Sequence, residues 1–290
     1  MVTSNKRVKV AFLSIISNSL LIIFKIIAGI LSGSVSIISE AIHSGMDLIA
    51  SLIAFLSVRY STKPADEKHP YGHGKIENLS GLVEGFLIFI AAVMIMIEAL
   101  KKLFKPIEIE QETIAITVMI VAALVNYFVS RILYRVAKEE DSMALEADAL
   151  HLKTDIYTSL GVALGIFLIK ITGLNILDSI VAIFVALLII KEAWGLSKNA
   201  FHYIIDVRLS EEEEEEIEKI IKEHNSKFID YHKLKTRKSG NMKHVDFHIT
   251  VNKNLTVEET HNIIASLKRD INEKLKNTRV NIHVDPFKNK

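Results

Sequence analysis

The sequence contains no cysteine in its 290 residues. This absence excludes disulfide bonds, thiolate metal ligands and cysteine nucleophiles, so any bound metal must be held by His, Asp, Glu or backbone oxygen. The formal net charge is only +1, and the chain as a whole therefore gives no electrostatic support for a nucleic-acid partner. The sequence also lacks the HExxH motif of zinc metalloproteases.

Hydrophobic residues make up 50% of the sequence, and the mean hydropathy is +0.30. They are concentrated before about residue 200, whereas the remainder is strongly charged. This asymmetry predicts a membrane domain at 1–202 and a cytoplasmic C-terminal domain at 203–290. The N-terminus begins like a signal peptide, but its apolar run reaches spanning length without a clear cleavage site. We therefore expect it to form the first membrane helix.

Six apolar segments are each long enough to cross ~30 Å of hydrocarbon as a helix, which takes ~20 residues. They cover 8–31, 35–59, 77–101, 112–136, 146–170 and 175–197. Lys25 interrupts the first segment, and we expect its side chain to snorkel to the nearer interface. Lysine and arginine gather in the loops on one side, so the positive-inside rule places both termini in the cytoplasm. The chain is predicted to be a polytopic α-helical membrane protein.

Two of these segments each carry a histidine and an aspartate four residues apart, namely His43 and Asp47, and His151 and Asp155. In a helix, residues i and i+4 share one face, about 6 Å apart along the axis. Packing the two faces together would bring two imidazoles and two carboxylates into one site. Four such ligands suit a tetrahedral divalent metal, zinc first. One pair could be explained by hydrogen bonding to a neighbouring helix, but two pairs indicate a metal site.

Three other acidic residues fall within or near apolar runs. Asp148 lies three residues before His151 on the same helix face, where it could pass protons or ions, and we interpret it as an interfacial polar residue. Glu84 and Asp178 are expected to form hydrogen bonds between helices.

The tail alternates between helical and strand patterns. Ser210, followed by Glu211–Glu216, is a predicted N-cap with an acid-rich first turn, and Thr256 with Glu259 predicts a capping box that opens a helix to about 276. Strands are expected at 229–237, 243–251 and 279–285, with a hairpin turn at 239–241. The order αββαβ predicts a small α+β domain, ferredoxin-like or metallochaperone-like, with its helices on one face of the sheet.

The loop after the second segment, Asp66-Glu-Lys-His69-Pro-Tyr-Gly-His73, offers one carboxylate and two imidazoles. With this loop, the two HxxxD segments, the six spans and the α+β tail, the chain resembles the cation diffusion facilitator family of divalent-metal transporters over nearly its whole length. The stretches that carry the resemblance are SEAIHSGMDLIAS at 39–51, PADEKHPYGHGKIE at 64–77 and EADALHLKTDIYTSLG at 146–161.

The resemblance implies a homodimer in the cytoplasmic membrane that exports a divalent cation, commonly zinc, in exchange for protons by alternating access. It implies neither an enzyme nor an organic cofactor. The transport site matches His43, Asp47, His151 and Asp155. Imidazole ligands favour zinc over harder cations such as manganese, although Fe²⁺, Cd²⁺, Co²⁺ and Mn²⁺ stay open. An imidazole titrates near pH ~6.5, so protonating either histidine would compete with the metal.

The resemblance also implies sites outside the membrane. Zinc in the tail could be structural or regulatory. The matching positions are Asp66, His69 and His73 in a cytoplasmic-side loop site, His232, His248, His261, His283 and Asp285 in a tail site near the dimer interface, and Lys75 and Asp206 in a charge interlock. His244 and Asp246 share the strand of His248 and are expected to face solvent.

Three other functions are alternatives to transport. An intramembrane metalloenzyme needs an open water position and a general base, which a closed four-ligand set does not supply. Tight four-ligand binding also opposes a channel, since conduction requires ions to leave easily. A membrane metal sensor that does not transport stays open, and metal binding without flux would identify it.

Overall fold

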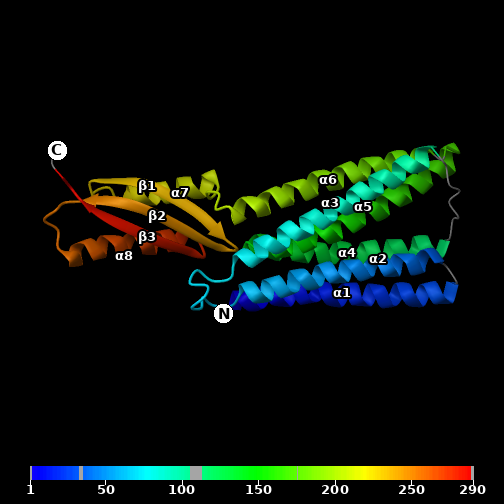
Figure 1. Cartoon of the computed structure of the whole chain (residues 1–290), viewed down its shortest axis with the longest axis horizontal. Coiled ribbons are helices and arrows are strands. Elements are labelled where there is room, and N and C mark those ends of the chain that lie inside the picture. The colour runs from blue at the N-terminus through cyan, green and yellow to red at the C-terminus, as the bar shows by residue number, and fades with distance from the viewer. Residues whose placement is uncertain (1, 33–34, 105–112, 175, 289–290) are drawn as a thin grey trace. The chain divides into compact units, whose positions relative to one another are not determined.

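The computed structural model describes residues 2–32, 35–104, 113–174 and 176–288. The chain divides into two compact units, Met1–Phe201 and His202–Lys290. Six long helices build the first unit (Figure 1): α1 Val2–Ser32, α2 Val35–Ser61, α3 Lys75–Phe104, α4 Thr113–Glu140, α5 Met143–Thr172 and α6 Ile176–Ile204. The predicted first residues of the fourth and sixth spans, 112 and 175, lie outside the described residues.

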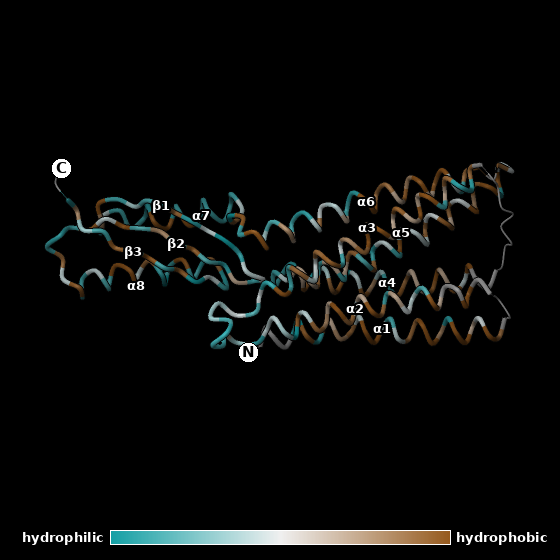
Figure 2. The backbone as a smooth tube through the Cα atoms, viewed as in Figure 1, coloured by the Kyte–Doolittle hydropathy of each residue, from teal (hydrophilic) through white to brown (hydrophobic). Residues whose placement is uncertain are grey.

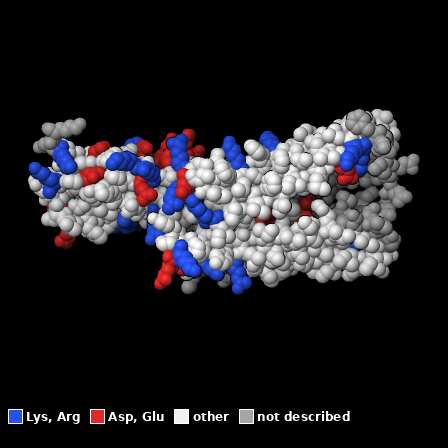
Figure 3. All heavy atoms as spheres, viewed as in Figure 1, with Lys and Arg blue, Asp and Glu red and all other residues white. Residues whose placement is uncertain are grey.

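Helices α1 to α5 are long and apolar enough to cross a membrane, by length and composition, in the part of the chain that the structure describes. Figure 2 shows the apolar character of the helices against the mixed character of the second unit. Charged side chains gather over the second unit and around the helix ends, with a largely uncharged surface between them (Figure 3). The predicted helical membrane domain is confirmed, and crossing of the membrane by α6 stays a prediction.

Helix α5 is central to the first unit, because it contacts α2, α3 and α4. Small residues allow these close approaches: a Cβ atom on Gly81 of α3 would lie 2.6 Å from Cγ of Met143 at the start of α5. Membrane helices associate through such close packing. The contact between α2 and α5 places the two HxxxD faces opposite one another.

Helix α1 begins well before the predicted start at residue 8. Its early turns include Arg7, which is buried because its Nη1 pairs with Oε1 of Glu77 on α3 at 2.7 Å. Glu77 also accepts hydrogen bonds from Ser61 at the end of α2 and Ser142 just before α5. One buried carboxylate therefore joins four helix ends.

The second unit has the predicted order αββαβ, which confirms the α+β tail. Its elements are α7 Glu211–Glu223, β1 Asp230–Ser239, β2 Met242–Val251, α8 Val257–Lys274 and β3 Thr278–Pro286. The strand order is β1-β2-β3, with β1 antiparallel and β3 parallel to β2. The parallel pair is expected, because α8 is the crossover between β2 and β3.

Both predicted helix starts are confirmed, since Ser210 with Glu213 and Thr256 with Glu259 form complete capping boxes. Gly240, at φ 59°, occupies the tight β1–β2 turn, where a residue with a Cβ atom would be strained. The core combines one face of the sheet with both helices, and its fully buried members include Ile217, Ile221, Phe247, Ile249, Leu267 and Ile271. The tail thus has a core of its own.

Candidate metal centres

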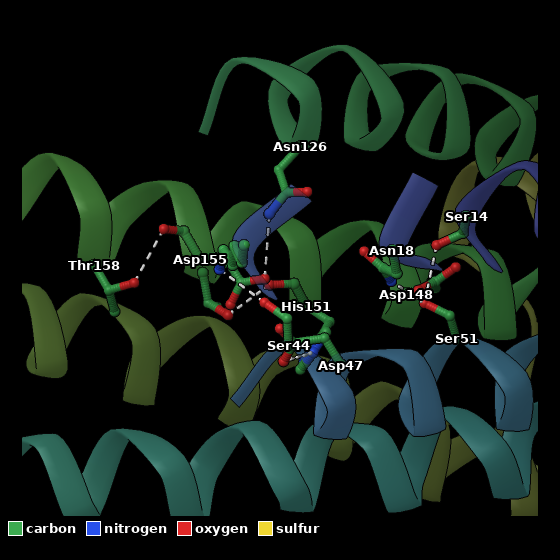
Figure 4. Close-up of polar contacts among 12 residues, drawn as sticks. Ser14, Asn18, Ser44, Asp47, Ser51, Asn126, Asp148, His151, Asp155 and Thr158 are labelled. Carbon is green, nitrogen blue, oxygen red and sulfur yellow. Dashed lines mark hydrogen bonds and ion pairs between the residues drawn. The ribbon is translucent and has the colours of Figure 1, made fainter. Parts of the chain in front are cut away.

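Helices α2 and α5 bring the two HxxxD pairs together. One ligand atom from each of His43, Asp47 and Asp155 lies within 4.8 Å of the others. Nε2 of His151 lies 3.1 Å from Oδ1 of Asp47, so the fourth residue joins the group through this contact (Figure 4). Because each helix presents residues i and i+4 on one face, a single helix–helix contact suffices to assemble all four side chains.

The four side chains offer two carboxylates and two imidazoles, a donor set that suits a tetrahedral zinc ion. The two carboxylates can balance the charge of a divalent cation while both imidazoles are neutral. Asp47 is buried, His151 and Asp155 are half-buried, and His43 is exposed. This difference in exposure leaves the cluster accessible from the side of His43.

Two residues beside this cluster were not predicted as parts of it. Nδ2 of Asn126 on α4 donates a hydrogen bond of 3.4 Å to Oδ2 of Asp155. Nζ of Lys25 on α1 donates to Oγ of Ser44 at 2.7 Å, and its charge acts on both aspartates of the cluster. The prediction that Lys25 snorkels to the interface is wrong, because its side chain is buried beside polar partners.

A second polar group is centred on Asp148, one turn before His151 on α5. Oγ of Ser51 on α2 donates to Oδ1 of Asp148 at 2.9 Å. Ser51 in turn contacts Ser14 and Asn18 of α1 at 3.0 and 2.7 Å (Figure 4). Asp148 is 0% exposed and lies inside the bundle, where hydroxyl groups hydrogen-bond it, and its position relative to the membrane interface stays a prediction.

The other two acidic residues of the apolar segments, Asp178 and Glu84, differ in their contacts. Asp178 of α6 does join helices, but through an ion pair with Nζ of Lys102 on α3 at 3.9 Å. Glu84 accepts a hydrogen bond of 3.0 Å from Ser80, which lies on the same helix. The expected hydrogen bond from Glu84 to another helix is therefore not found among the described residues.

The loop between α2 and α3 brings its predicted ligands together around Asp66. Nδ1 of His69 lies 2.9 Å from Oδ1 of Asp66, and Nε2 of His73 lies 3.3 Å from Oδ2. Partial desolvation raises the pKa of the Asp66 carboxyl, but hydrogen bonds from the His69 backbone and ring outweigh it, so the net pKa is lowered. The carboxylate is thus held in the form that a metal requires.

The tail cluster forms along one row of the sheet. His232 on β1, His248 on β2 and His283 on β3 are directly in register. Nε2 of His232, Nδ1 of His248 and Nε2 of His283 lie 3.4, 2.9 and 3.5 Å from the carboxylate oxygens of Asp285. The hydrogen bond from His248 lowers the pKa of the Asp285 carboxyl, and the charges of the three histidines add to this effect.

Three further tail predictions fare differently. His261 is exposed on α8 and is not grouped with the other four residues in the described part of the chain. His244 is only 5% exposed, so its expected solvent-facing position is wrong. Asp206 pairs within the tail, at 3.4 Å from Nη1 of Arg237, and its interlock with Lys75 stays a prediction.

Comparison with known proteins identifies the family. Residues 11–205 match the model of the cation efflux transmembrane domain, and residues 209–287 match that of the cytoplasmic domain of cation efflux proteins. The chain belongs to the cation efflux family, also called the cation diffusion facilitators. The predicted resemblance is confirmed, and members of this family are transporters of divalent metal cations and not enzymes.

Three relatives illustrate the range of the family. The chain is 32% identical over 257 residues to an uncharacterised transporter of Synechocystis, covering 89% of this chain and 83% of the relative. It is 30% identical to the cation-efflux pump FieF of Shewanella oneidensis, covering 92% and 89%, respectively. It is also 30% identical to the manganese efflux system protein MneP of Bacillus subtilis, covering 96% of each chain. This protein is therefore a multi-pass membrane protein for cation efflux.

Proposed function

We propose that this protein exports Zn²⁺ from the cytoplasm in exchange for protons, and that His43, Asp47, His151 and Asp155 bind the transported ion. The observation that carries the proposal is the convergence of the two HxxxD faces, in which Nε2 of His151 lies 3.1 Å from Oδ1 of Asp47. The protein lies in the cytoplasmic membrane with six spans, both termini in the cytoplasm, and domains at 1–202 and 203–290.

The choice of zinc rests on the ligand types. Two imidazoles with two carboxylates form a donor set of intermediate softness. Such a set suits zinc, whereas hard cations prefer sets made only of oxygen atoms. One relative is named for manganese efflux, so Mn²⁺ is the first cation to compare with Zn²⁺. Fe²⁺, Cd²⁺ and Co²⁺ are compared next.

Proton exchange follows from the chemistry of the same donors. An imidazole binds a metal only when the coordinating nitrogen carries no proton, so a proton and the cation compete for His43 and His151. A more acidic outer side therefore favours release of the cation there, and the neutral cytoplasm favours its binding. No separate proton pathway is required for this part of the exchange.

The sites outside the membrane belong to the same proposal. The exporter is a homodimer whose tail cluster, His232, His248, His261, His283 and Asp285, binds zinc with a structural or regulatory role. Asp66, His69 and His73 form a loop site, and the interlock of Lys75 with Asp206 stabilises the cytoplasmic face of the dimer. The register of three histidines on neighbouring strands supports the tail site.

Uptake into proteoliposomes tests the proposed function. The lumen holds a zinc-sensitive dye at acidic pH, and Zn²⁺, Mn²⁺ and Fe²⁺ are added outside in parallel. We expect zinc uptake driven by the pH gradient, lost in Asp155→Asn, and kept in the matched variant Glu146→Gln, because Glu146 lies on the same helix α5 but pairs with Lys138 of α4. Binding without uptake would favour a metal sensor, and uptake of Mn²⁺ or Fe²⁺ alone would reassign the metal.

A further inference from the structure

Two carboxyl groups lie buried inside the helical unit without a role in the site described above. Glu84 on α3 is 1% exposed and Asp148 on α5 is 0% exposed. Each has one oxygen in a hydrogen bond, from Ser80 and Ser51 respectively. The second oxygens, Oε2 of Glu84 and Oδ2 of Asp148, are buried without a hydrogen-bond partner in the described structure.

The two groups interact with each other and with the proposed transport site. Helices α3 and α5 pack together, and the charges of Asp148 and His151 both act on Glu84. His151 also acts on Asp148, which lies one turn away on the same helix face. The other groups that face Asp148 are hydroxyls, those of Ser14 and Ser51. The two carboxyls are thus coupled to a histidine that we assign to the metal.

The protonation state of this pair before a cation binds follows from elementary electrostatics. A buried carboxylate without a cation in contact is costly, and two carboxylates that repel each other are costlier still. Neither group forms an ion pair with Lys or Arg among the described residues. Burial and mutual repulsion therefore favour the protonated form of both groups as long as no other positive charge comes close.

We propose that Glu84 and Asp148 are a proton-carrying pair, which loses protons when a divalent cation binds at the transport site and regains them after the cation leaves. This inference rests on the proposed function, because it adds proton carriers to the same exchange. The protons carried by this pair are distinct from those that compete with the cation for the imidazole nitrogens.

The step balances in bonds and in protons. When the divalent cation binds one helical turn from Asp148, its positive charge stabilises the nearby carboxylates. The O–H bond of the acid then breaks, the proton passes to water on the cytoplasmic side, and the positive charge of the cation attracts the carboxylate left behind. Both residues lie in the halves of α3 and α5 that are predicted to be nearer the cytoplasm. After the cation has left on the outer side, the carboxylate takes up a proton again.

The test uses the full-length protein in detergent and the isosteric variants Glu84→Gln and Asp148→Asn, singly and together. A pH dye counts the protons released as Zn²⁺ is titrated, and infrared difference spectra follow the carbonyl band of protonated carboxylic acids. Glu98→Gln is the control, since Glu98 is an exposed carboxylate of the same helix α3. Size-exclusion chromatography establishes that each variant is folded.

We expect zinc binding to remove the carbonyl band in the wild type and in Glu98→Gln. The double variant should lack this band change and release fewer protons for each cation bound. Its log affinity for zinc should also rise less steeply with pH, by up to about one for each carboxyl removed. Equal proton release and equal pH dependence in the wild type and the double variant would overturn the inference. A wild type that binds zinc without releasing any proton would overturn the proposed antiport together with this inference.

Discussion

At the scale of single residues, His244 makes the tail sensitive to acid. It lies in register between Arg237 on β1 and Arg279 on β3. Burial lowers the pKa of His244, and the positive charges of the two arginines lower it further. The folded tail therefore binds a proton at His244 less readily than the unfolded chain does.

The free energy of unfolding of the tail is expected to decrease as the pH falls. Above the unfolded pKa of ~6.5, His244 is neutral in both states and contributes no pH dependence. As the pH falls from there towards the lower pKa of the folded state, the unfolded chain gains a proton first, so the free energy of unfolding decreases. One proton gives at most about 1.4 kcal/mol per pH unit.

Denaturant unfolding of the metal-free fragment 203–290, which has its own core, measures this effect. We expect the wild type to lose stability between pH ~7 and the lower folded pKa, and His244→Gln to lose less over the same range. His261→Gln, at an exposed position of α8, should behave like the wild type. The same pH slope in His244→Gln and the wild type would show that His244 binds protons equally in both states.

Single residues also show which parts of the sites could be predicted from the sequence. His43 and Asp47, like His151 and Asp155, were predictable because the spacing of four alone places each pair on one helix face. The burial of Lys25 was not, since it depends on Ser44, a hydrogen-bond partner on another helix. Asn126 could be noticed in the sequence only as an amide side chain within an apolar run, which is a weak indication of a site. His261 is exposed because the buried stripe of α8 passes through Leu267 and Ile271.

At the scale of elements, the buried ion pair of Arg7 with Glu77 holds α1 against α3. Its two side chains are 7% and 0% exposed. Removing one partner of such a pair leaves the other charge buried without compensation, which costs about 3–5 kcal/mol. Lys6 and Glu139, by contrast, pair at the exposed surface between α1 and α4, where an ion pair contributes only about 0–1 kcal/mol.

We therefore predict that Glu77→Gln lowers the thermal stability of the purified full-length protein far more than Glu139→Gln does. Thermal unfolding in one detergent, followed by circular dichroism, compares the two variants directly. Equal losses in the two variants would mean that the Arg7 guanidinium is solvated and that its ion pair does not secure these helices.

Element boundaries were predictable where a local signal exists. The capping boxes at Ser210 and Thr256 are complete within four residues, and both predicted helix starts were therefore correct. The early start of α1 was missed, because the burial of Arg7 depends on Glu77, a residue 70 positions away. Hydropathy shows where a membrane span is apolar, but it does not show where the helix continues through polar residues.

At the scale of the whole molecule, the tail cluster offers a way to join two subunits. Three histidines and Asp285 lie close together on one sheet, which leaves them accessible to a shared zinc ion. We predict that Zn²⁺ makes the tails of the dimer more compact, which small-angle scattering detects as a smaller radius of gyration. The double variant His232→Ala, His283→Ala should lose this response, while Asp246→Asn should keep it. Identical scattering with and without zinc in the wild type would contradict the prediction.

The claim that His43, Asp47, His151 and Asp155 bind the cation together has a direct test. X-ray absorption spectroscopy at the zinc edge is measured on the full-length protein after His69→Ala, His232→Ala and His283→Ala have weakened the other clusters. We predict one tightly bound zinc with about four nitrogen and oxygen neighbours at about 2.0–2.2 Å. Adding Asp155→Asn should weaken binding by more than the roughly 10–100-fold caused by loss of an outer hydrogen-bond partner. Zinc held equally well after Asp155→Asn, or no tightly bound zinc at all, would contradict the claim.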